Sequence, residues 1–459
     1  MSSYASIINH PDPFIITVDT TKAGSATDTF ILPLYPGTTN CVVEWGDDTS
    51  DHIKISTQTD LTHVYPNSGS YQVSIIGNFV GTYFANGGDK LKLSSIDQWG
   101  SNSFTNMTKN FQGCENMVAN YTDVPNVSEC IAFFGAFQIC RSFNGSIAGW
   151  DFSNSLSFAN CFEFCDVFDQ PLVINAPLAT TYASMLSSAT SFNSSITIDS
   201  SNSNSFAGMF GNCTVFNQPV NLDTSKATNL SNMFINCVAF DQDINFTTPL
   251  VNNMSAMFSG CHIFNSSASF SDTSNVTLFT SFMNQCRLFN QPITLDTTGA
   301  TNMLQMFGNC WAFNQDVSWL TTTGVTNMQQ MFTLCYVFDQ DVSHFDTSLV
   351  TTFLQMFRFC YDFNQDLSSW DIGSLISTGG SLMFDTATSF THTNYSSSLI
   401  GWTGWDNQPS GSATQYVEPN VTFTGPPAGV ISGSHADRAR TYLVDIKLWT
   451  ITDGGYYVP

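Results

Sequence analysis

The sequence predicts an open α/β solenoid of about 11–12 repeats of 24–25 residues, preceded by a β-sandwich and followed by a capping segment. The first observation is a motif, TNMLQMFGNCWAFNQDVSW at residues 301–319, which recurs with small changes from about residue 104 to about residue 390. A fixed period of this length is typical of chains in which one supersecondary unit stacks on the next. The second observation is a change of composition at both ends of the repeats. The cysteines that mark the period are Cys114, Cys140, Cys165, Cys213, Cys237, Cys261, Cys286, Cys310, Cys335 and Cys360, with Ala189 in the corresponding place between Cys165 and Cys213.

Each repeat is expected to contain one short helix and one short strand. The apolar positions i, i+3, i+4 and i+7 define one face of a helix of about two turns: they are Met303, Met306, Phe307 and Cys310. Thr301 and Asn302 precede this segment and would cap its free N–H groups. Phe313 then returns to the core, and residues 316–319 alternate between polar and apolar side chains, which predicts a strand.

The chain divides into four predicted segments: an N-terminal arm at 1–12, a β-sandwich at 13–98, the repeat solenoid at 99–395 and a capping segment at 396–459. The sandwich is predicted from short strands that turn residues separate, namely FIITVDT, TFILPLY, CVVEWGDD, HIKIS and YQVSIIGNF. After the repeats, YSSSLIGW is expected to be a partial repeat, NVTFTG a strand, HADRARTYLVDIKLW a helix and TITDGGYYVP a closing strand. Such a terminal unit would cover the open end of the stack.

Two columns of side chains run through the repeats. The first holds phenylalanine, and the burial statistics of phenylalanine favour a stacked core over an aromatic binding face: Phe143, Phe168, Phe192, Phe216, Phe240, Phe264, Phe289, Phe313, Phe338 and Phe363. The second holds Asn or Asp, which we expect to bond to turns and to the same position one repeat away: Asn144, Asp169, Asn193, Asn217, Asp241, Asn265, Asn290, Asn314, Asp339 and Asn364.

The 13 cysteines predict buried free thiols rather than disulfides. Because each predicted helix ends in one cysteine, cysteines of consecutive repeats would lie on adjacent helices. Their Cα atoms would then be farther apart than the limit of about 7 Å for a disulfide. A buried thiol acts as a small hydrophobic side chain, and this is compatible with assembly in a reducing cytoplasm. Cys161 and Cys165 have no second pair at zinc spacing, so they are interpreted as a core pair.

The charge balance argues against nucleic acid as a partner. Charged residues are 10% of the chain, against about 25% in a typical domain. The 12 basic and 36 acidic residues give a net charge of −24, which repels phosphate backbones and anionic lipid. Divalent cations or a basic partner remain compatible, and solubility of a surface protein is the simpler interpretation. No apolar run reaches 18 residues, which predicts no membrane insertion.

The N-terminal residues MSSYASIINHPDPF lack a basic start and an apolar core of signal length. We therefore expect either that the chain is not secreted by that route or that the numbering omits a leader.

One constellation of side chains merits a chemical interpretation. Asp316, Asp341 and Asp366 occupy the same place in three consecutive repeats, and stacked strands would set their Cα atoms roughly 5 Å apart. Retaining glycosidases use two carboxyl groups at about this separation. The alternative is an exposed acidic column, and a repeated column does not supply the apolar pocket that raises the pKa of one carboxyl. We therefore predict no catalytic, cofactor-binding or metal-binding residues.

Two groups of residues in the front region form a recognisable pattern. They are Trp45, Gly46, Asp47 and Asp48 before a hairpin, and His63, Tyr65, Gly69 and Tyr71 leading into a later strand. With them, about 60 residues resemble the polycystic-kidney-disease-type domain, an immunoglobulin-like sandwich that usually serves as a spacer or adhesion module.

The repeats resemble the BspA-like leucine-rich-repeat surface proteins, which are also known from mycoplasma-type lipoproteins. The matching parts are MF at 306–307, Cys310, FNQDVSW at 313–319 and the ending RTYLVDIKLWTITDGG at 440–455. The resemblance implies a solenoid of the leucine-rich-repeat type and a surface-exposed, non-enzymatic binding or adhesion protein of bacteria, protists or viruses. The sequence departs from that family in showing no signal peptide, lipid-attachment cysteine or sorting tail.

We therefore expect a non-enzymatic structural or adhesion protein on a virion or phage surface, either capsid-decorating or fibre-like. It would present its repeats to a protein or glycan ligand on a host, or to a neighbouring subunit. The alternatives are a bacterial cell-surface adhesin and a polysaccharide-degrading enzyme. With both ends of the stack covered, contacts would be lateral or would involve the N-terminal arm and sandwich. Polar Ser/Thr/Asn faces and exposed aromatic residues such as Trp402 and Trp405 would carry them.

Overall fold

The computed structural model describes residues 12–35, 39–53, 60–404, 422–424 and 429–457. The predicted arm, apart from Asp12, lies outside these residues. The chain forms two compact units, Met1–Asp223 and Thr224–Pro459, and repeats occur in both of them.

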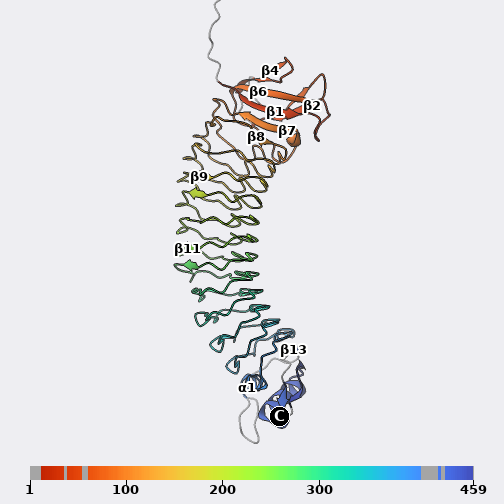
Figure 1. The fold of residues 1–459 in the computed structure, drawn as a ribbon, viewed down its shortest axis with the longest axis vertical. Helices are drawn as coiled ribbons and strands as arrows, with labels where there is room; N and C mark the ends of the chain where they lie inside the picture. The colour runs from red at the N-terminus through yellow and green to blue at the C-terminus, as the bar shows by residue number, and fades with distance from the viewer. Residues whose placement is uncertain (1–11, 36–38, 54–59, 405–421, 425–428, 458–459) are drawn as a thin grey trace, which may run out of the picture. The chain divides into compact units, whose positions relative to one another are not determined.

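The front of the first unit consists of two β-sheets (Figure 1). One sheet has the strand order β4-β3-β6-β1-β7-β8, and the other pairs β2 with β5. In β1 the side chains of Phe14, Ile16 and Val18 alternate with less buried ones, as expected for a strand with one face on a core. The strands are β1 (Phe14–Asp19), β2 (Thr29–Pro33), β3 (Thr39–Glu44), β4 (Ser50–Ile53), β5 (Asp60–Val64), β6 (Ser70–Asn78), β7 (Leu93–Gln98) and β8 (Val118–Ala119), and a 3-10 turn, η1 (Lys90–Lys92), precedes β7.

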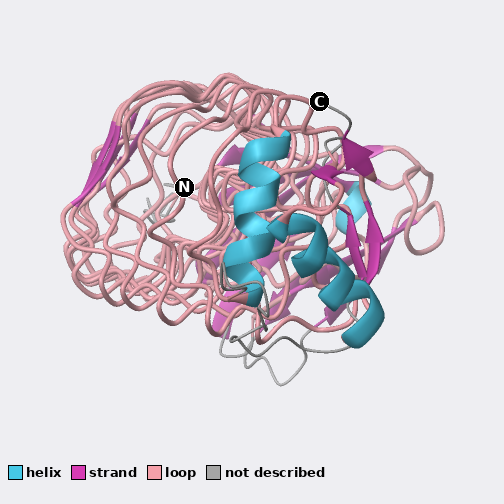
Figure 2. Cartoon of the chain, turned by 90° about the horizontal axis from the view of Figure 1, so that it is seen from below, coloured by secondary structure: helices cyan, strands magenta, loops and turns pink. Residues whose placement is uncertain are grey.

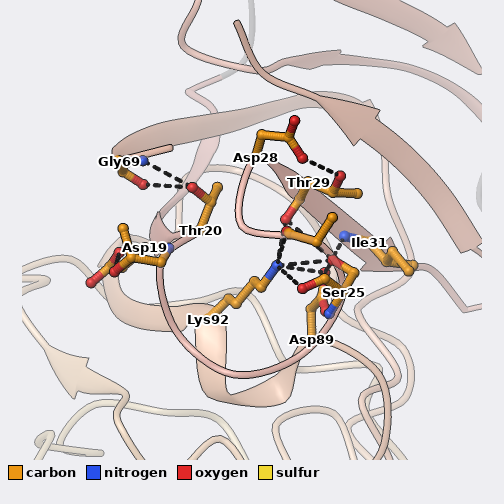
Figure 3. A network of polar contacts seen from close by, with 11 residues as sticks. Asp19, Thr20, Ser25, Asp28, Thr29, Ile31, Gly69, Asp89 and Lys92 are labelled. Atoms are coloured by element: carbon orange, nitrogen blue, oxygen red, sulfur yellow. Dashed lines mark hydrogen bonds and ion pairs between the residues drawn. The ribbon is translucent and has the colours of Figure 1, made fainter. Parts of the chain in front are cut away.

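A buried ion pair fixes the loop before β2 against η1 (Figure 3). The Lys92 ammonium donates to the carbonyl oxygens of Ala26 and Thr29 at 2.8 and 2.7 Å. The Asp89 carboxylate accepts from the backbone N–H groups of Ser25 and Ile31 at 2.6 and 2.7 Å. Both charged side chains are almost fully buried, and their hydrogen bonds supply the compensation that buried charges require. This network positions the start of the second sheet.

The predicted α/β solenoid of the leucine-rich-repeat type is wrong, because the repeats contain no helix. Among the described residues the only α-helices are α1 (His392–Thr403) and α2 (His435–Thr441), both C-terminal to the repeats (Figure 2). The predicted helix at residues 303–310 is a run of turns. Its Gln305 and Asn309 have φ angles of 55° and 60°, in the left-handed region that a right-handed helix of L-residues does not contain.

Backbone hydrogen bonds in this run alternate between two kinds of partner. The N–H groups of Met306, Gly308 and Cys310 close tight turns onto carbonyls three residues earlier, at 3.0–3.2 Å. The N–H groups of Met303, Gln305, Phe307 and Asn309 donate instead to residues 327, 329, 331 and 333 of the next repeat, at 2.7–3.0 Å. Consecutive repeats are therefore joined directly through their backbones, which satisfies groups that burial would otherwise leave unpaired.

The predicted strand at residues 316–319 is also absent from the structure. Isolated parallel bridges join Asn253, Leu278, Asn302, Asn327 and Thr352 in consecutive repeats of the second unit. Three-residue parallel pairs occur elsewhere, where a buried apolar first residue is followed by an exposed one. They are β9 (Leu172–Ile174) with β10 (Ile196–Ile198) in the first unit, and β11 (Ile244–Phe246) with β12 (Ala268–Phe270) in the second.

The phenylalanine column is a stacked core, as predicted, and all ten members are fully buried. The Phe338 ring lies 6.0 Å from the Phe313 ring and 6.2 Å from the Phe363 ring, both within 6° of parallel. The Asn/Asp column joins neighbouring repeats as predicted: the side-chain oxygen of Asn314 accepts the backbone N–H of Asp339 at 3.0 Å, and that of Asp339 accepts the N–H of Asn364 at 2.9 Å.

All 13 cysteines are free and buried, which confirms the predicted thiols. The predicted reason is wrong, since no helices separate the repeats. Eight of the repeat cysteines instead donate their thiol to a backbone carbonyl of the preceding repeat, as Cys335 Sγ does to Phe307 O at 3.0 Å. That oxygen also accepts the N–H of Cys310 at 3.2 Å, so the thiol uses its second lone pair.

The thiols of the repeat cysteines should react with a thiol reagent only after denaturation. Burial raises the pKa of Cys310 and of Cys335, so the reactive thiolate is suppressed as well as inaccessible. We expect almost no labelling of the native chain and labelling of all the cysteines in denaturant, measured by intact mass. Fast labelling of several native cysteines, or disulfides between repeats, would contradict this assignment.

The C-terminal part of the second unit begins with α1. The predicted partial repeat YSSSLIGW forms most of this helix, and Gly404 ends it with a left-handed φ of 57°. Trp402 is buried, contrary to the prediction, and donates to Leu367 O at 2.9 Å, while Trp405 lies outside the described residues. The remaining elements are β13 (Thr422–Thr424), β14 (Val430–Ile431), α2, the π-helical turn η2 (Tyr442–Ile446), β15 (Thr450–Thr452) and β16 (Tyr456–Tyr457).

Asp453 connects three parts of this segment. Its buried carboxylate accepts two hydrogen bonds from the Arg440 guanidinium in α2, at 2.8 and 2.9 Å. It also accepts the hydroxyl of Tyr395 in α1 at 2.7 Å and the backbone N–H of Gly455 at 2.9 Å. Burial alone would raise the pKa of Asp453, but these hydrogen bonds outweigh it and leave the pKa lowered.

Acid should loosen this segment through Asp453. Since the folded pKa lies below the unfolded value of about 3.9, the stability that the group contributes is present above about pH 4 and is lost as pH falls further. We expect faster hydrogen exchange in α1 below about pH 4. An Asp453→Asn variant should already exchange faster at pH 7 and respond less to acid. Asp362→Asn, at an exposed carboxyl, is the matched control. Equal pH profiles of hydrogen exchange in the unmodified chain and in both variants would refute this role of Asp453.

Candidate binding surface

The aspartates that sequence analysis singled out each close a turn of their own. Asp316 accepts the backbone N–H of Ser318 at 2.9 Å, and Asp341 accepts that of Ser343 at 2.8 Å. Asp366 makes the same contact with the N–H of Ser368 at 2.9 Å. All three carboxylates are exposed, which is the arrangement of an acidic surface column.

The electrostatics of this column differ from those of an acid–base pair. The backbone hydrogen bond from Ser318 lowers the pKa of Asp316, and that from Ser343 lowers the pKa of Asp341. A general acid at neutral pH needs a raised pKa, usually in an apolar pocket. Within the part of the chain that the structure describes, no group of three or more His, Cys, Asp or Glu side chains is arranged to hold a metal ion.

A different surface stands out in the second unit, at the turn that follows the repeat cysteine. In four consecutive repeats, the one or two positions after that cysteine carry large apolar, aromatic or arginine side chains. We call this set the aromatic corner: Arg287, Leu288, Trp311, Tyr336, Val337 and Tyr361.

The rings of the aromatic corner stack on one another from repeat to repeat. The Trp311 and Tyr336 ring centroids are 5.7 Å apart, and those of Tyr336 and Tyr361 are 5.3 Å apart, both pairs with planes inclined by 23°. The Arg287 guanidinium carbon lies 4.8 Å from the Trp311 ring centroid, in cation–π geometry. The result is a continuous stack of one guanidinium and three rings.

The fold does not require these side chains. The equivalent position holds Asp166, Thr190 and Thr214 in repeats of the first unit, which make the same turn. The larger residues stay substantially exposed: 37% of Trp311, 41% of Tyr361 and 52% of Leu288 is accessible to solvent. A contiguous exposed apolar patch of this kind marks an interaction site more often than a structural need.

The two arginines near the aromatic corner, Arg287 and Arg358, differ in whether an acidic side chain pairs with them. Arg358 packs over the Phe359 ring at 4.7 Å and pairs with Asp385 at 2.9 Å. Arg287 forms no ion pair with any residue that the structure describes. In a chain with 12 basic and 36 acidic residues, an unneutralised arginine beside exposed rings is unusual.

Sequence analysis missed the aromatic corner, although a signal was present. The residue after the repeat cysteine is aromatic in three consecutive repeats, at Trp311, Tyr336 and Tyr361. Earlier repeats carry varied residue types there, such as Glu115, Asp166, Thr214 and Val238. Columns shared by all repeats define the core, whereas this change occurs in only some repeats.

These observations define a stacked-repeat protein whose repeats join backbone to backbone and expose an aromatic corner. The family described as "Mycoplasma protein of unknown function, DUF285" matches residues 80–198, 174–248, 245–333 and 301–403. The chain belongs to this family, which confirms the resemblance to mycoplasma-type repeats. The matches begin at residue 80, so the resemblance of the front region to a polycystic-kidney-disease-type domain stays a prediction.

No curated protein and no solved structure matches the chain. Among the residues that the structure describes, neither α-helix is both long and apolar enough to cross a membrane.

Proposed function

We propose that the chain is a non-enzymatic, surface-exposed repeat protein that attaches to a macromolecular ligand through the aromatic corner. The observation that carries this proposal is the stack of exposed Trp311, half-buried Tyr336 and exposed Tyr361, which the turn itself does not need. Tryptophan, tyrosine and arginine are the residues most enriched among the energetic centres of protein interfaces. The net charge of −24 favours a ligand other than nucleic acid.

The location we propose is the surface of a virion or phage, with a bacterial cell surface as the alternative. Membership of a family of mycoplasma-type repeat proteins supports a surface role, and the β-sheets before the repeats would serve as a spacer. Antibody labelling of purified particles and of intact cells tests the location. Label on neither surface would refute it.

Attachment through the aromatic corner is tested with substitutions taken from the chain's own repeats. A Trp311→Thr/Tyr361→Thr variant carries the residue found at positions 190 and 214, so the turn should fold normally. We expect it to lose attachment to the labelled surface at least 30-fold, because truncating an interface centre typically costs about 2 kcal/mol or more. Leu349→Thr, at another exposed apolar site in the same unit, is the control. Unchanged attachment of the double variant would refute the role of the corner.

The competing function is polysaccharide cleavage by the stacked aspartates. Incubation with a panel of polysaccharides and measurement of new reducing ends separates the two functions. We expect no product. Reducing ends that disappear in an Asp341→Asn variant would favour the enzyme instead.

A further inference from the structure

Resting on that proposed function, we propose that the aromatic corner binds a protein segment in which an acidic side chain lies beside apolar side chains. Three features define this partner: the parts of the rings that reach solvent, the charge of Arg287 and the apolar side chains that border the stack.

The flat faces of the central rings are already occupied. Trp311 lies between the Arg287 guanidinium and the Tyr336 ring, and Tyr336 lies between Trp311 and Tyr361. Since 37% of Trp311 is still exposed, its exposed surface is chiefly ring edge. The edge of an aromatic ring carries the positive part of its quadrupole, so these edges attract oxygen acceptors.

Arg287 adds a full positive charge to the end of this stack. Its guanidinium has no acidic partner among the described residues, in contrast to Arg358, which pairs with Asp385. A guanidinium matches a carboxylate with two parallel hydrogen bonds, and this pairing also fixes orientation. The partner should therefore place one carboxylate over Arg287 and the neighbouring ring edge.

The apolar part of the partner is defined by Leu288 and Val337, which border the stack and are 52% and 38% exposed. Burying such side chains removes apolar surface from water, which favours association. A peptide with leucine or an aromatic residue close to its acidic residue would cover them.

This surface fits a protein better than a glycan or a second copy of the chain. A sugar ring packs against an open aromatic face, and both faces of Trp311 and of Tyr336 are occupied. A two-fold contact between two corners would oppose ring edges of the same sign and bring together two chains of net charge −24. The same net charge selects a partner whose acidic residue is local and whose overall charge is neutral or basic.

The test selects ligands from a displayed library of random twelve-residue peptides on the immobilised full-length chain. Peptides that also bind the Trp311→Thr/Tyr361→Thr variant are removed. We expect the remaining peptides to share Asp or Glu within a few residues of Leu, Phe or Trp. Arg287→Gln should weaken them about tenfold or more, as expected for the loss of a charge-assisted pair. Changing the acidic residue of the peptide to its amide should have a similar effect.

The decisive measurement is the double-mutant cycle. If Arg287 contacts the carboxylate, combining the Arg287→Gln chain with the amide peptide should reduce the binding affinity little more than either change alone. Additive losses, selected peptides without an acidic residue, or no selected peptide at all would overturn the proposal. Binding to a glycan array that depends on the aromatic corner would also overturn the proposal. A dimer that Arg287→Asp abolishes, and that the added substitution Asp362→Arg restores, would overturn it as well.

The two proposals fail in different ways. If corner variants lose surface attachment but the selected peptides are neutral, the attachment function stands and the acidic partner is wrong. If corner variants retain surface attachment, the proposed function itself is wrong.

Discussion

Deletion of residues 396–459 should make the chain aggregate or form fibres. The deleted segment includes most of α1 and Phe423, whose ring packs edge-on against Phe384 at 6.0 Å. Phe384 and the neighbouring Phe390 are both buried in the full chain. The deleted segment also continues the backbone pairing of the repeats, because Thr422 donates to Ser377 O at 2.7 Å. Its removal exposes both an apolar surface and unpaired backbone groups, the combination that recruits further chains.

A point variant provides a control that keeps the chain length. A Cβ atom added to Gly401 would lie 2.1 Å from the carbonyl oxygen of Ser368, so Gly401→Ala should push α1 away from the last repeat. We expect Gly401→Ala to increase aggregation and to lower the melting temperature less than the deletion does, measured by light scattering and thermal melting. A deletion variant that stays monomeric and melts like the full chain would show that this segment does not protect the repeats.

Phe338→Ala should destabilise the second unit by about 3–5 kcal/mol, the usual range for a buried phenylalanine. Its ring is fully buried and also lies 4.2 Å from that of Phe332, so no side chain can fill the space without breaking the stack. Tyr336→Thr, two residues earlier, should cost less than about 1.5 kcal/mol, because its half-buried ring loses chiefly the stacking contacts with Trp311 and Tyr361. The first change should therefore affect folding and the second ligand attachment.

Urea denaturation of the two variants measures this contrast. The midpoint should fall strongly for Phe338→Ala and only slightly for Tyr336→Thr, with hydrogen exchange locating the loss in the neighbouring repeats. Similar midpoints for the two variants would mean that the exposed and buried columns contribute equally to the stack.

The sequence identified the core of the repeats but not their backbone. The spacing of Met303, Met306, Phe307 and Cys310 predicts a helix, and all four side chains are buried. The same spacing also fits a run of turns, since two residues in left-handed conformation return the chain to the same face. Apolar periodicity reports which residues are buried, and here two backbone conformations satisfy it equally well.

A local signal for the turns lay in the residue before each repeat cysteine. That residue adopts a positive φ throughout, and it is asparagine or glycine in several repeats, the residue types that tolerate this conformation: Gly113, Asn212, Asn236, Gly260 and Asn309. Leu334 and Phe359 take the same conformation without that signal, held there by backbone bonds to the next repeat. No property of those two residues alone could have predicted it.

The sequence predicts the aromatic corner less well than it predicts the core. Its residues are visible in the sequence, but their exposure depends on the turn, and the stacking of Trp311 on Tyr336 depends on the distance between repeats. Both quantities follow from the backbone bonds that sequence analysis did not anticipate. The run of aromatic residues could be read from the sequence, but its arrangement as a stacked surface could be recognised only from the repeat geometry.

The direct bonding of repeat to repeat has a mechanical consequence. A pulling force applied along the stacking direction of the second unit would load the several N–H···O bonds between two repeats together, as at residues 303–309, so they would break as a set. Each detached repeat would release 24–25 residues, roughly 80 Å of extended chain at about 3.4 Å per residue. A protein attached at one end would thus lengthen in steps under load and keep its remaining repeats folded.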